Sequence, residues 1–365
     1  MFQDVYIIGA TGRVGSTLVR QIIEKGDISA RLHTNPTRIV GLASRERTVY
    51  VPEGVSAEQA YAFTNKDYTD TQTYRDLLEL LELVNSTRHD GGALVFVDVT
   101  AVGEQMTGFH LAVIERTPHG IVTANKNPLT LCDYSLFQQL SRYPRRYGYR
   151  CSVMAGAEAV PFLQDLRDLN DRLFTIEGCL SGTIGYITSE LEKSKPFSMI
   201  LQQAHASGYT EPHPRDDLSG LDVARKLCIL ARTAGYPINI EDIKLEPFVP
   251  REFLLENDVE RFLQAANLLD EDFKGRMSRA QKHGKTLRYV ARMNNRGNCP
   301  DLTVSLQEVP QDSSLGNLEG TKNKSVIASE AYMDGYSIES IGAGLQVTAR
   351  NIRRDLLGLL PKRSF

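Results

Sequence analysis

Residues 5–23 read VYIIGATGRVGSTLVRQII, and the character of the sequence changes twice within them. The first four residues are β-branched or aromatic and predict a strand, whereas the apolar residues at positions 18, 19, 22 and 23 have the spacing of a helix. Gly9, Gly12 and Gly15 lie between the two elements. Because glycines have no side chains, the turn can tighten and the first helical N–H groups can approach a pyrophosphate. The segment therefore predicts a nucleotide-binding strand, turn and helix.

The spacing of these glycines is Gly-x-x-Gly-x-x-Gly rather than the commoner Gly-x-Gly-x-x-Gly, so a plain tight turn is the alternative. NAD-selective sites carry an acidic residue near the end of the second strand. Here Ser44, Arg45 and Arg47 follow that strand, and Arg13 is expected close by. Hydroxyl and guanidinium donors suit a 2′-phosphate, which favours NADP over NAD and leaves NAD possible. A solvated loop face is the other interpretation of these arginines.

Strand and helix patterns alternate through the first 150 residues. Strands are predicted at 38–43, 94–99, 120–123 and 149–154, with helices at 73–84, 110–116 and 135–145. Such alternation is typical of a parallel sheet covered by helices. We therefore expect residues 1–150 to form an α/β domain with a Rossmann-like, doubly wound parallel sheet.

The pattern changes after residue 150, which indicates a second domain of different architecture. A helix is predicted at 159–169 and a strand at 175–180, followed by mostly helical sequence to about residue 282. Further strands are predicted at 286–291, 302–306 and 325–328, and a last helix at 347–360.

Composition narrows the class of protein and of partner. A net charge of −3 gives no overall attraction to nucleic acid or to an anionic membrane, and the apolar runs are too short to span a bilayer. The N-terminus lacks a basic leader followed by a long apolar segment. The five cysteines are widely spaced and fit neither a disulfide framework nor a zinc site. We expect a cytoplasmic protein that acts on a small molecule and binds no metal.

The densest polar stretch is residues 208–226, GYTEPHPRDDLSGLDVARK. Its two prolines favour an extended loop around Glu211, with a helix beginning after them. Three side chains could cap that helix: Asp216, Asp217 and Ser219. His213 has a suitable pKa for catalysis, but a loop histidine between prolines is more often exposed and idle.

Asp222 and Lys226 stand four residues apart, so they share one helix face. An ordinary surface ion pair explains that spacing equally well. Glu211 just before the helix favours a functional interpretation, in which two carboxylates and a lysine bind an amino-acid ammonium and move a proton. Lys126 is a further candidate because it follows a predicted strand at the carboxyl edge of the first sheet, where ligands collect. A solvated loop lysine is the alternative there.

These motifs resemble homoserine dehydrogenase, and the resemblance is strongest to the dehydrogenase half of the bifunctional aspartokinase–homoserine dehydrogenases. The segments that carry it are 123–126 (TANK), 180–187 (LSGTIGYI), 208–226 and 342–349 (GAGLQVTA). Together they span nearly the whole chain. The long segment that includes Glu211 and ends at Lys226 is the most specific of them.

The resemblance implies reversible, NAD(P)H-dependent reduction of L-aspartate 4-semialdehyde to L-homoserine, a step of threonine and methionine biosynthesis. It implies that residues 151–340 bind substrate and form a homodimer, and that residues 341–365 return to the nucleotide domain. Glu211 and Asp222 would bind the amino-acid part of the substrate, while Lys226, assisted by Lys126, would transfer the proton. The implied cofactor contacts are Gly9, Thr11, Gly12, Arg13, Val14, Gly15, Ser44, Arg45, Thr100, Ala124, Lys126 and Gly344.

Some features depart from the family pattern. The glycine-rich segment that coordinates a monovalent cation in relatives reads MAGAEAVP at 154–161, and the acid that usually precedes it is missing near Cys151. We therefore expect no sodium or other metal site. We also expect no aspartokinase portion and no amino-acid-sensing domain after the last helix.

Two other functions remain open. Residues 9–12, GATG, also resemble aspartate-semialdehyde dehydrogenase, which needs a nucleophilic cysteine, but no cysteine here has a flanking signature. A related semialdehyde or amino-acid reductase is the broader form of that alternative. A cofactor-binding protein that senses amino acids without turnover is the alternative from a different class.

Overall fold

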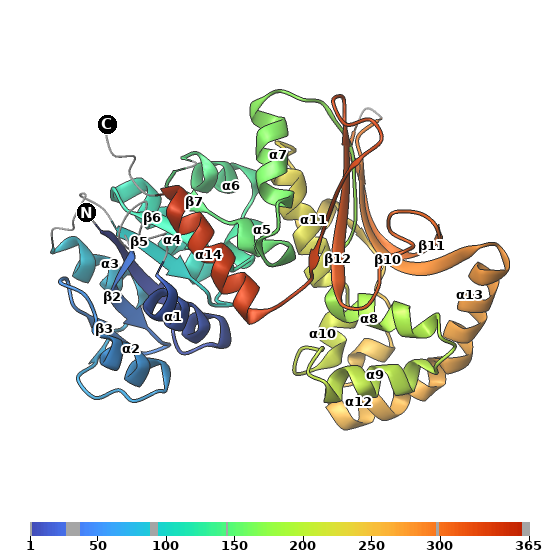
Figure 1. The fold of residues 1–365 in the computed structure, drawn as a ribbon, viewed down its shortest axis with the longest axis horizontal. Helices are drawn as coiled ribbons and strands as arrows, with labels where there is room; N and C mark the ends of the chain where they lie inside the picture. The colour runs from blue at the N-terminus through green and yellow to red at the C-terminus, as the bar shows by residue number, and fades with distance from the viewer. Residues whose placement is uncertain (1, 27–36, 88–93, 144, 297–298, 360–365) are drawn as a thin grey trace. The chain divides into compact units, whose positions relative to one another are not determined.

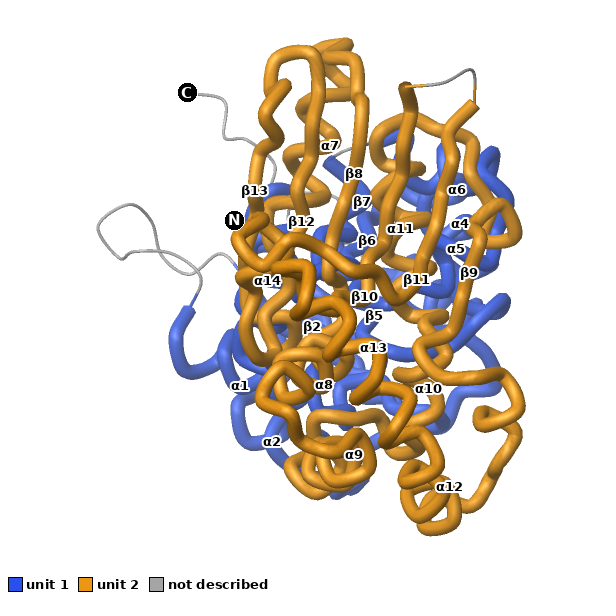
Figure 2. Tube along the Cα trace, turned by 90° about the vertical axis from the view of Figure 1, so that its right-hand side faces the viewer, with its two compact units in different colours: residues 1–156, 344–365 blue, residues 157–343 orange. Residues whose placement is uncertain are grey.

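The computed structural model describes residues 2–26, 37–87, 94–143, 145–296 and 299–359 (Figure 1). The chain divides into two compact units (Figure 2). Unit 1 consists of Met1–Gly156 and Gly344–Phe365, and unit 2 of Ala157–Ala343. Residues 151–156, which we expected in the second domain, therefore lie in unit 1.

Unit 1 is built on a seven-stranded sheet in the order β4-β3-β2-β1-β5-β6-β7. Its strands are β1 (Gln3–Ile8), β2 (Thr37–Ala43), β3 (Arg47–Tyr50), β4 (Gln72–Thr73), β5 (Leu94–Asp98), β6 (Gly120–Thr123) and β7 (Tyr147–Gly148). Five neighbouring strands of this sheet, β2, β1, β5, β6 and β7, pair in parallel. This confirms the predicted α/β fold class. β3 and β4 add an antiparallel extension beyond β2. β1 and β5 are buried along their whole length, as expected for strands covered on both faces.

Helices cover this sheet (Figure 1). They are α1 (Arg13–Lys25), α2 (Ala57–Thr64), α3 (Leu77–Asn85), α4 (Glu104–Arg116), α5 (Asn127–Thr130), α6 (Tyr134–Ser141) and α14 (Leu345–Leu359). α14 packs against α1, and Ala349, Ile352 and Leu356 join Leu18 and Val19 in one buried cluster. The last segment of the chain thus completes the core of unit 1.

The strand predicted at 149–154 is wrong. Two 3₁₀ turns, η2 (Arg150–Ser152) and η3 (Met154–Gly156), follow β7 instead. Met154 and Ala155 both have φ of 50°, and Gly156 has φ of 88°. Because left-handed backbone cannot continue a strand, the β-branched and aromatic pattern is overridden here.

Unit 2 contains a six-stranded sheet in the order β13-β12-β8-β10-β11-β9. Its strands are β8 (Leu173–Cys179), β9 (Lys244–Leu245), β10 (Lys285–Asn294), β11 (Asp301–Pro310), β12 (Lys322–Ser329) and β13 (Tyr336–Ile341). All of its pairings are antiparallel except that of β9 with β11. Its helices are α7 (Ala159–Asp168), α8 (Gly182–Leu191), α9 (Phe197–Ala206), α10 (Pro214–Leu218), α11 (Leu221–Thr233), α12 (Val259–Ala265) and α13 (Asp270–Lys282), with 3₁₀ turns η4 (Ile240–Asp242), η5 (Phe253–Leu255) and η6 (Ala266–Leu269). Unit 2 thus has the mixed α/β architecture that we predicted from the sequence of the second half of the chain.

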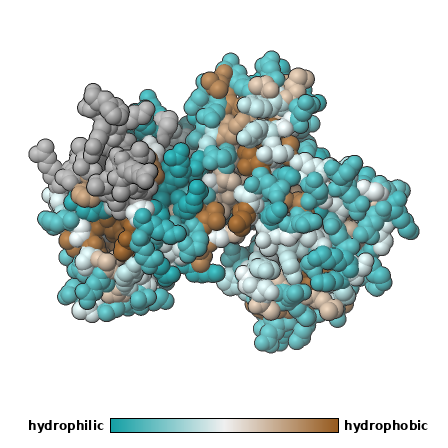
Figure 3. Space-filling model, viewed as in Figure 1, coloured by the Kyte–Doolittle hydropathy of each residue, from teal (hydrophilic) through white to brown (hydrophobic). Residues whose placement is uncertain are grey.

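The surfaces of both units are mostly polar in the view of Figure 3. Over the described residues, the structure contains no helix that combines the length and apolar character needed to cross a bilayer.

Candidate active site

The glycine turn of unit 1 joins β1 to α1 and depends on the absence of side chains. Gly9 has φ of 89°, a conformation that favours glycine. A Cβ on Gly15 would lie 2.2 Å from the carbonyl oxygen of Gly9, so the helix could not approach the turn with any larger residue there. The N–H groups of Gly9 and Ala10 both donate to the carbonyl of Ala43 in β2, at 2.9 and 3.0 Å. The turn is thereby fixed at the carboxyl ends of the two central strands.

The first turn of α1 suits an anion. Its N-cap is Gly12, which provides no side-chain hydrogen bond, and no acidic residue lies in the first turn. The N–H groups at a helix start carry partial positive charge, and Arg13 adds an exposed guanidinium beside them. Val14 is the second residue of this turn, and Thr11 stands just before it.

Ser44 and Arg45 lie in the turn that connects β2 to β3. The backbone N–H of Ser44 donates to the carbonyl of Arg47 at 2.8 Å, and the Tyr74 hydroxyl donates to the carbonyl of Ser44 at 2.5 Å. This antiparallel turn holds Ser44 in place, while the Arg45 side chain is exposed. The hydroxyl of Ser44 and the guanidinium of Arg45 therefore lie beyond the end of β2, where the 2′-phosphate of a bound NADP would be recognised.

Polar side chains order the loops after β5 and β6. The N–H and hydroxyl of Thr100 both donate to Asp98, at 2.9 and 2.7 Å, and the N–H of Ala124 donates to the carbonyl of Asp98 at 3.0 Å. Asn125 connects the two loops by donating to the carbonyl of Val102 at 2.9 Å. These bonds place Thr100 and Ala124 on ordered backbone at the same edge of the sheet as the glycine turn.

Lys126 and Gly344 lie at the starts of helices in unit 1. Lys126 is the N-cap residue of α5, and its carbonyl accepts bonds from Leu129 and Thr130 at 3.0 and 2.9 Å. Gly344 immediately precedes α14, and a Cβ there would meet no atom of the described residues within 4 Å. No packing requirement in unit 1 therefore explains glycine at this position.

In unit 2 the Lys226 ammonium has two acceptors. Its Nζ lies 2.8 Å from Asp222 Oδ2 and donates to the carbonyl oxygen of Leu180 at 2.6 Å. The Lys226 side chain is 11% exposed, whereas that of Asp222 is 44% exposed. The pair on α11 is thus anchored to the end of β8 and is more buried than an ordinary surface ion pair.

The loop that carries Glu211 is tied to the same region through Asp217. The Glu211 N–H donates to Asp217 Oδ2 at 2.8 Å, and the Thr183 hydroxyl donates to Asp217 Oδ1 at 2.8 Å. Glu211 itself is exposed. Thr183 belongs to α8, so these bonds join the loop to a helix that begins at the end of β8.

Asp217 is a further candidate site residue, which the sequence analysis considered only as a helix cap. Burial, together with the nearby negative charges of Glu211 and Asp222, raises the pKa of Asp217 to about 6, although the two donated hydrogen bonds oppose the shift. Glu211 and Asp222 thus both act on Asp217, and Asp222 is the acid paired with Lys226. Such a group of like charges fits a cationic ligand, because an ammonium would relieve their repulsion.

The helix with the apolar face expected after the prolines is α11, whose N-cap is Gly220 and not Asp216, Asp217 or Ser219, although the Ser219 hydroxyl accepts the Leu221 N–H at 3.2 Å. A separate short helix precedes it. α10 begins at Pro214 itself, so Asp216 and Asp217 lie inside it, and the cap is His213, whose Nδ1 accepts from the Arg215 N–H at 3.2 Å. A helix that begins at Pro214 is compatible with the sequence, because proline is well suited to the first turn of a helix.

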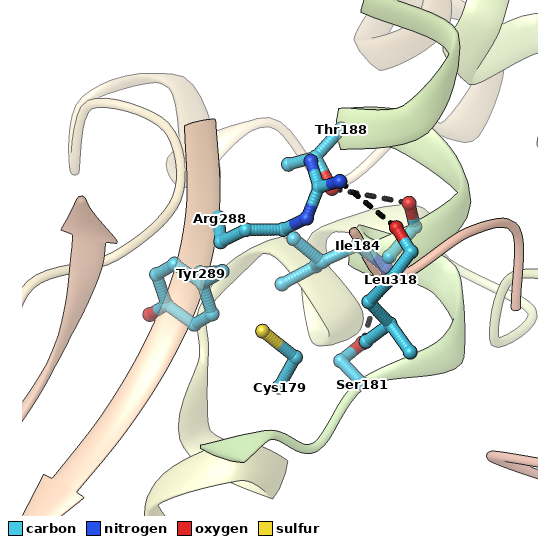
Figure 4. A pocket seen from close by; sticks show the side chains of 8 residues that line it. Cys179, Ser181, Ile184, Thr188, Arg288, Tyr289 and Leu318 are labelled. Carbon is cyan, nitrogen blue, oxygen red and sulfur yellow. Dashed lines mark hydrogen bonds between the residues drawn. The ribbon is translucent and has the colours of Figure 1, made fainter. Parts of the chain in front are cut away.

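A small cavity in unit 2 is lined by none of these acids and not by Lys226 (Figure 4). Cys179, Tyr289 and Arg288 are among its lining residues, and its volume of about 10 Å³ has room for about one water molecule. Burial raises the pKa of the Cys179 thiol to about 12 and that of Cys151 well above its usual value. Both thiols are therefore poor nucleophiles.

The described residues show no group of three His, Cys, Asp or Glu side chains placed to hold a metal ion. In the 154–161 segment, the carbonyl of Ala155 accepts a hydrogen bond from Asn351 Nδ2 at 2.8 Å. A Cβ on Gly156 would lie 2.5 Å from the Cβ of Asn351, so this segment is closely packed against α14.

Comparison with known proteins identifies the family. The model of the homoserine dehydrogenase family matches residues 161–357. The bifunctional aspartokinase/homoserine dehydrogenase of Haemophilus influenzae is 31% identical over 361 residues, which are 98% of this chain and 43% of that protein. This chain thus spans less than half the length of the curated relatives that it matches.

Solved structures share the fold. A Candida auris protein of unknown function has a TM-score of 0.85 at 27% identity, with 98% of each chain covered. A hyperthermophilic archaeal homoserine dehydrogenase in complex with NADPH has a TM-score of 0.71 at 19% identity, covering 98% of this chain and 97% of that one. Since the family model covers more than half of the chain and the relative aligns along nearly all of it, this chain belongs to the homoserine dehydrogenase family.

Proposed function

We propose that this protein reversibly reduces L-aspartate 4-semialdehyde to L-homoserine with NADPH, in the biosynthesis of threonine and methionine. Family membership supports the reaction, and the observation that carries the proposal is the half-buried lysine of unit 2. An ammonium held between a carboxylate and a carbonyl beside two further acids is suited to an aldehyde substrate that carries an amino group.

The residues of unit 1 fit a dinucleotide. Gly9 and Gly15 allow the turn and α1 to pack closely, and the uncapped start of α1 supplies N–H groups together with Arg13. NADPH bound there supplies the hydride that the aldehyde carbon receives. Thr100, Ala124 and Gly344 are the contacts we assign near the other end of the cofactor, on the ordered loops after β5 and β6 and before α14.

Ser44 and Arg45 support a preference for NADP over NAD. The turn after β2 offers a hydroxyl and an exposed guanidinium instead of the acid that would bind a ribose 2′-hydroxyl. Phosphate binds a guanidinium in a two-bond geometry, whereas the uncharged ribose of NAD would gain less there. The hyperthermophilic archaeal homoserine dehydrogenase of similar fold was solved in complex with NADPH.

The carboxylates of unit 2 are assigned to the substrate. Glu211 and Asp222 bind the amino-acid part, and the ionised form of Asp217, which burial disfavours, becomes favourable when an ammonium lies beside it. Asp217 is therefore a binding group for the same charge. It also positions Glu211, whose backbone N–H it accepts.

Lys226 is assigned the proton transfer. When a hydride reaches the aldehyde carbon, its oxygen becomes negative, and an ammonium within hydrogen-bond reach can stabilise and then protonate it. The hydrogen bond to the Leu180 carbonyl fixes Nζ, and Asp222 orients the same ammonium. We assign Lys126, at the end of β6, a supporting role in this step.

The alternative enzyme class has less support. A phosphorylating semialdehyde dehydrogenase needs a reactive thiolate, and burial keeps Cys151 and Cys179 protonated. Cys132 and Cys228 are also buried, and the exposed Cys299 lies just before β11. A non-catalytic sensor would need no lysine anchored as Lys226 is.

The proposal includes a homodimer in the cytosol, formed through unit 2. The supporting feature is the edge strand β13, which carries exposed apolar side chains such as Tyr336 and Ile341. An exposed strand edge with apolar residues is a common pairing surface. Light scattering on purified protein measures this directly, and a monomer at micromolar concentration would refute it.

The test of the activity follows NADPH absorbance with aspartate semialdehyde as substrate. Lys226→Met should lower kcat by about 10²–10⁴-fold, the usual contribution of a positioned proton donor. The fold should survive, because the Leu180 carbonyl keeps a hydrogen bond from Asn323 Nδ2 at 3.0 Å. Lys244→Met is the matched control, since Lys244 of unit 2 is also paired with an aspartate but is 75% exposed.

Three outcomes would contradict the proposal. Formation of NADPH from aspartate semialdehyde and NADP⁺ that requires added phosphate would indicate the cysteine-dependent enzyme. NADPH binding without any turnover of the parent protein would indicate the sensor. Equal activity of the parent and Lys226→Met would remove the assigned proton donor.

A further inference from the structure

We infer that unit 1 contains a second anion site, a groove between α1 and α14 that binds a hydroxyl-bearing organic phosphate. The groove has a volume of about 450 Å³, in the range of small-molecule sites. The residues that line it are Gln21, Lys25, Gln346, Val347, Arg350, Arg353, Arg354 and Leu357. Figure 1 shows the two helices side by side, in agreement with their packing.

The charge of the groove comes from one face of α14 and the end of α1. Arg350, Arg353 and Arg354 follow the three- and four-residue spacing of a helix face, opposite the buried residues of α14. Lys25 faces them from the last turn of α1. No Asp or Glu is among the described residues that line the groove. Asp355, the acid next to them in sequence, bonds instead to Arg150, whose Nε lies 3.3 Å from its Oδ1.

The groove is held in shape by contacts between helices distant in sequence. Gln21 Nε2 donates to the carbonyl and to the side-chain oxygen of Gln346, at 2.9 and 2.7 Å. The Arg353 guanidinium donates to the carbonyl of Gly26, which caps α1. The four cationic side chains of the groove, Lys25, Arg350, Arg353 and Arg354, therefore lie on two helices that hydrogen bonds hold together.

One buried acceptor narrows the chemistry of the ligand. Gln21 is 5% exposed, and its Oε1 has no hydrogen-bond partner among the described residues. Its amide orientation is settled by the two acceptors on Gln346 that receive Nε2. An acceptor left unpaired at a cationic groove calls for a ligand that also brings a donor, and a hydroxyl is the donor that accompanies phosphate in metabolites.

Phosphate is favoured over carboxylate as the anionic group. Guanidinium groups bind phosphate through two parallel hydrogen bonds, and a polyphosphate offers several such faces to Arg350, Arg353 and Arg354 together. The groove is not the cofactor turn, because Gln21 and Lys25 lie about 12 and 18 Å along α1 from Arg13 at a rise of 1.5 Å per residue. The two ends of one helix would then serve two phosphate-bearing ligands.

The test is isothermal titration calorimetry on the full chain with ATP, tripolyphosphate or citrate as probe, in the presence of saturating NADPH. ATP carries hydroxyls and phosphates, tripolyphosphate only phosphates, and citrate clustered carboxylates. The variant Arg350→Gln/Arg354→Gln removes two exposed cations of the groove. Arg75→Gln/Arg116→Gln removes two exposed cations elsewhere in unit 1 and is the matched control.

We expect saturable binding of ATP and weaker binding of tripolyphosphate, because tripolyphosphate brings no hydroxyl donor for Gln21 Oε1. Both probes should bind at least tenfold more weakly to the groove variant and within twofold of the parent to the control. Equal binding of ATP and tripolyphosphate by the parent would refute the hydroxyl requirement. Citrate should bind at least tenfold more weakly than tripolyphosphate. Equal losses in both variants would show attraction by net charge alone, and equal binding of citrate would refute the phosphate class. If the groove variant binds the probes normally but changes the oligomeric state, the groove is an interface between two copies, and the inference is overturned.

This inference does not depend on the proposed reaction. If NADPH fails to bind, the same titrations are made on the unliganded protein with Arg13→Gln added, which removes a cation of the glycine turn. Loss of probe binding through Arg350→Gln/Arg354→Gln in that background still supports the groove. Loss through Arg13→Gln alone would place the probe at the turn instead.

Discussion

Replacing Asp217 by Asn should stabilise the protein at alkaline pH. In the folded state the pKa of Asp217 rises from 3.8 to about 6, chiefly through burial. The Asn side chain fits the same bonds: its oxygen accepts the Glu211 N–H, and its amide donates to the Thr183 hydroxyl, which still donates to the Tyr209 carbonyl. Asn therefore reproduces the neutral form of Asp217 without its ionisation.

The magnitude follows from the two pKa values. The neutral carboxyl is favoured in the folded state, so its contribution is complete below pH 3.8 and is lost as the pH rises through about 6. At 1.36 kcal/mol per pKa unit, ionised Asp217 costs up to about 3 kcal/mol at pH 8. The Asn variant avoids that cost, so we expect it to be more stable than the parent by about 1–3 kcal/mol at pH 8 and by little at pH 4.

The assay is urea unfolding of both proteins at several pH values, with Asp216→Asn as the control. Asp216 is the neighbouring residue, has a 62% exposed side chain and lies 3.8 Å from its arginine partner, so its replacement should change stability little at any pH. A gain for Asp217→Asn that grows between pH 4 and pH 6 supports the reasoning. An Asn variant that is no more stable than the parent at pH 8 would refute it. Because Asp217 is assigned to the substrate ammonium, the stabilised variant should also have a raised KM.

Three further predictions concern other parts of the protein. Gly15→Ala should weaken NADPH binding in calorimetry and lower stability by about 1–3 kcal/mol, because its Cβ would meet the Gly9 carbonyl at 2.2 Å, whereas Gly108→Ala, with nothing within 4 Å, should be tolerated. Arg45→Glu should lower kcat/KM for NADPH relative to NADH by at least tenfold, and an unchanged ratio would remove Arg45 from the 2′-phosphate site. The Cys179→Ala variant should be as active as the parent protein and should be inhibited by thiol reagents to the same extent as the parent, since the buried thiol takes no part in the reaction. Loss of turnover with an intact fold would support a cysteine-dependent mechanism.

The sequence predicted the fold where local patterns and packing agree. The strand, glycine turn and helix at 5–23 appear as β1 and α1, because apolar residues at a helix spacing also face the sheet. Family membership could be inferred from motifs such as 208–226, and the comparisons confirm it. The strand predicted at 149–154 failed because residues 150–152 form a 3₁₀ turn and Met154 and Ala155 have left-handed backbone, in a segment that is hydrogen-bonded to α14 nearly 200 residues away.

The site was predictable only in part for the same reason. Spacing along α11 correctly placed Asp222 and Lys226 together, and the structure shows their ion pair. The sequence could not show that Thr183 reaches Asp217, or that Leu180 accepts from Lys226, because these partners are 34 and 46 residues apart. Acidic residues within six positions of Glu211 were the one local signal that could have pointed to Asp217. The groove between α1 and α14 was likewise invisible, since Gln21 and Gln346 are separated by 325 residues.

Direct transfer of hydride from the cofactor to the aldehyde is the central claim, and isotope transfer measures it. Aspartate semialdehyde is incubated with NADPH that carries deuterium at the transferred position, and the product is analysed by mass spectrometry and NMR. The account predicts homoserine with one deuterium on the carbon that bears the new hydroxyl. Cofactor oxidation without homoserine, or homoserine without deuterium at that carbon, would contradict it.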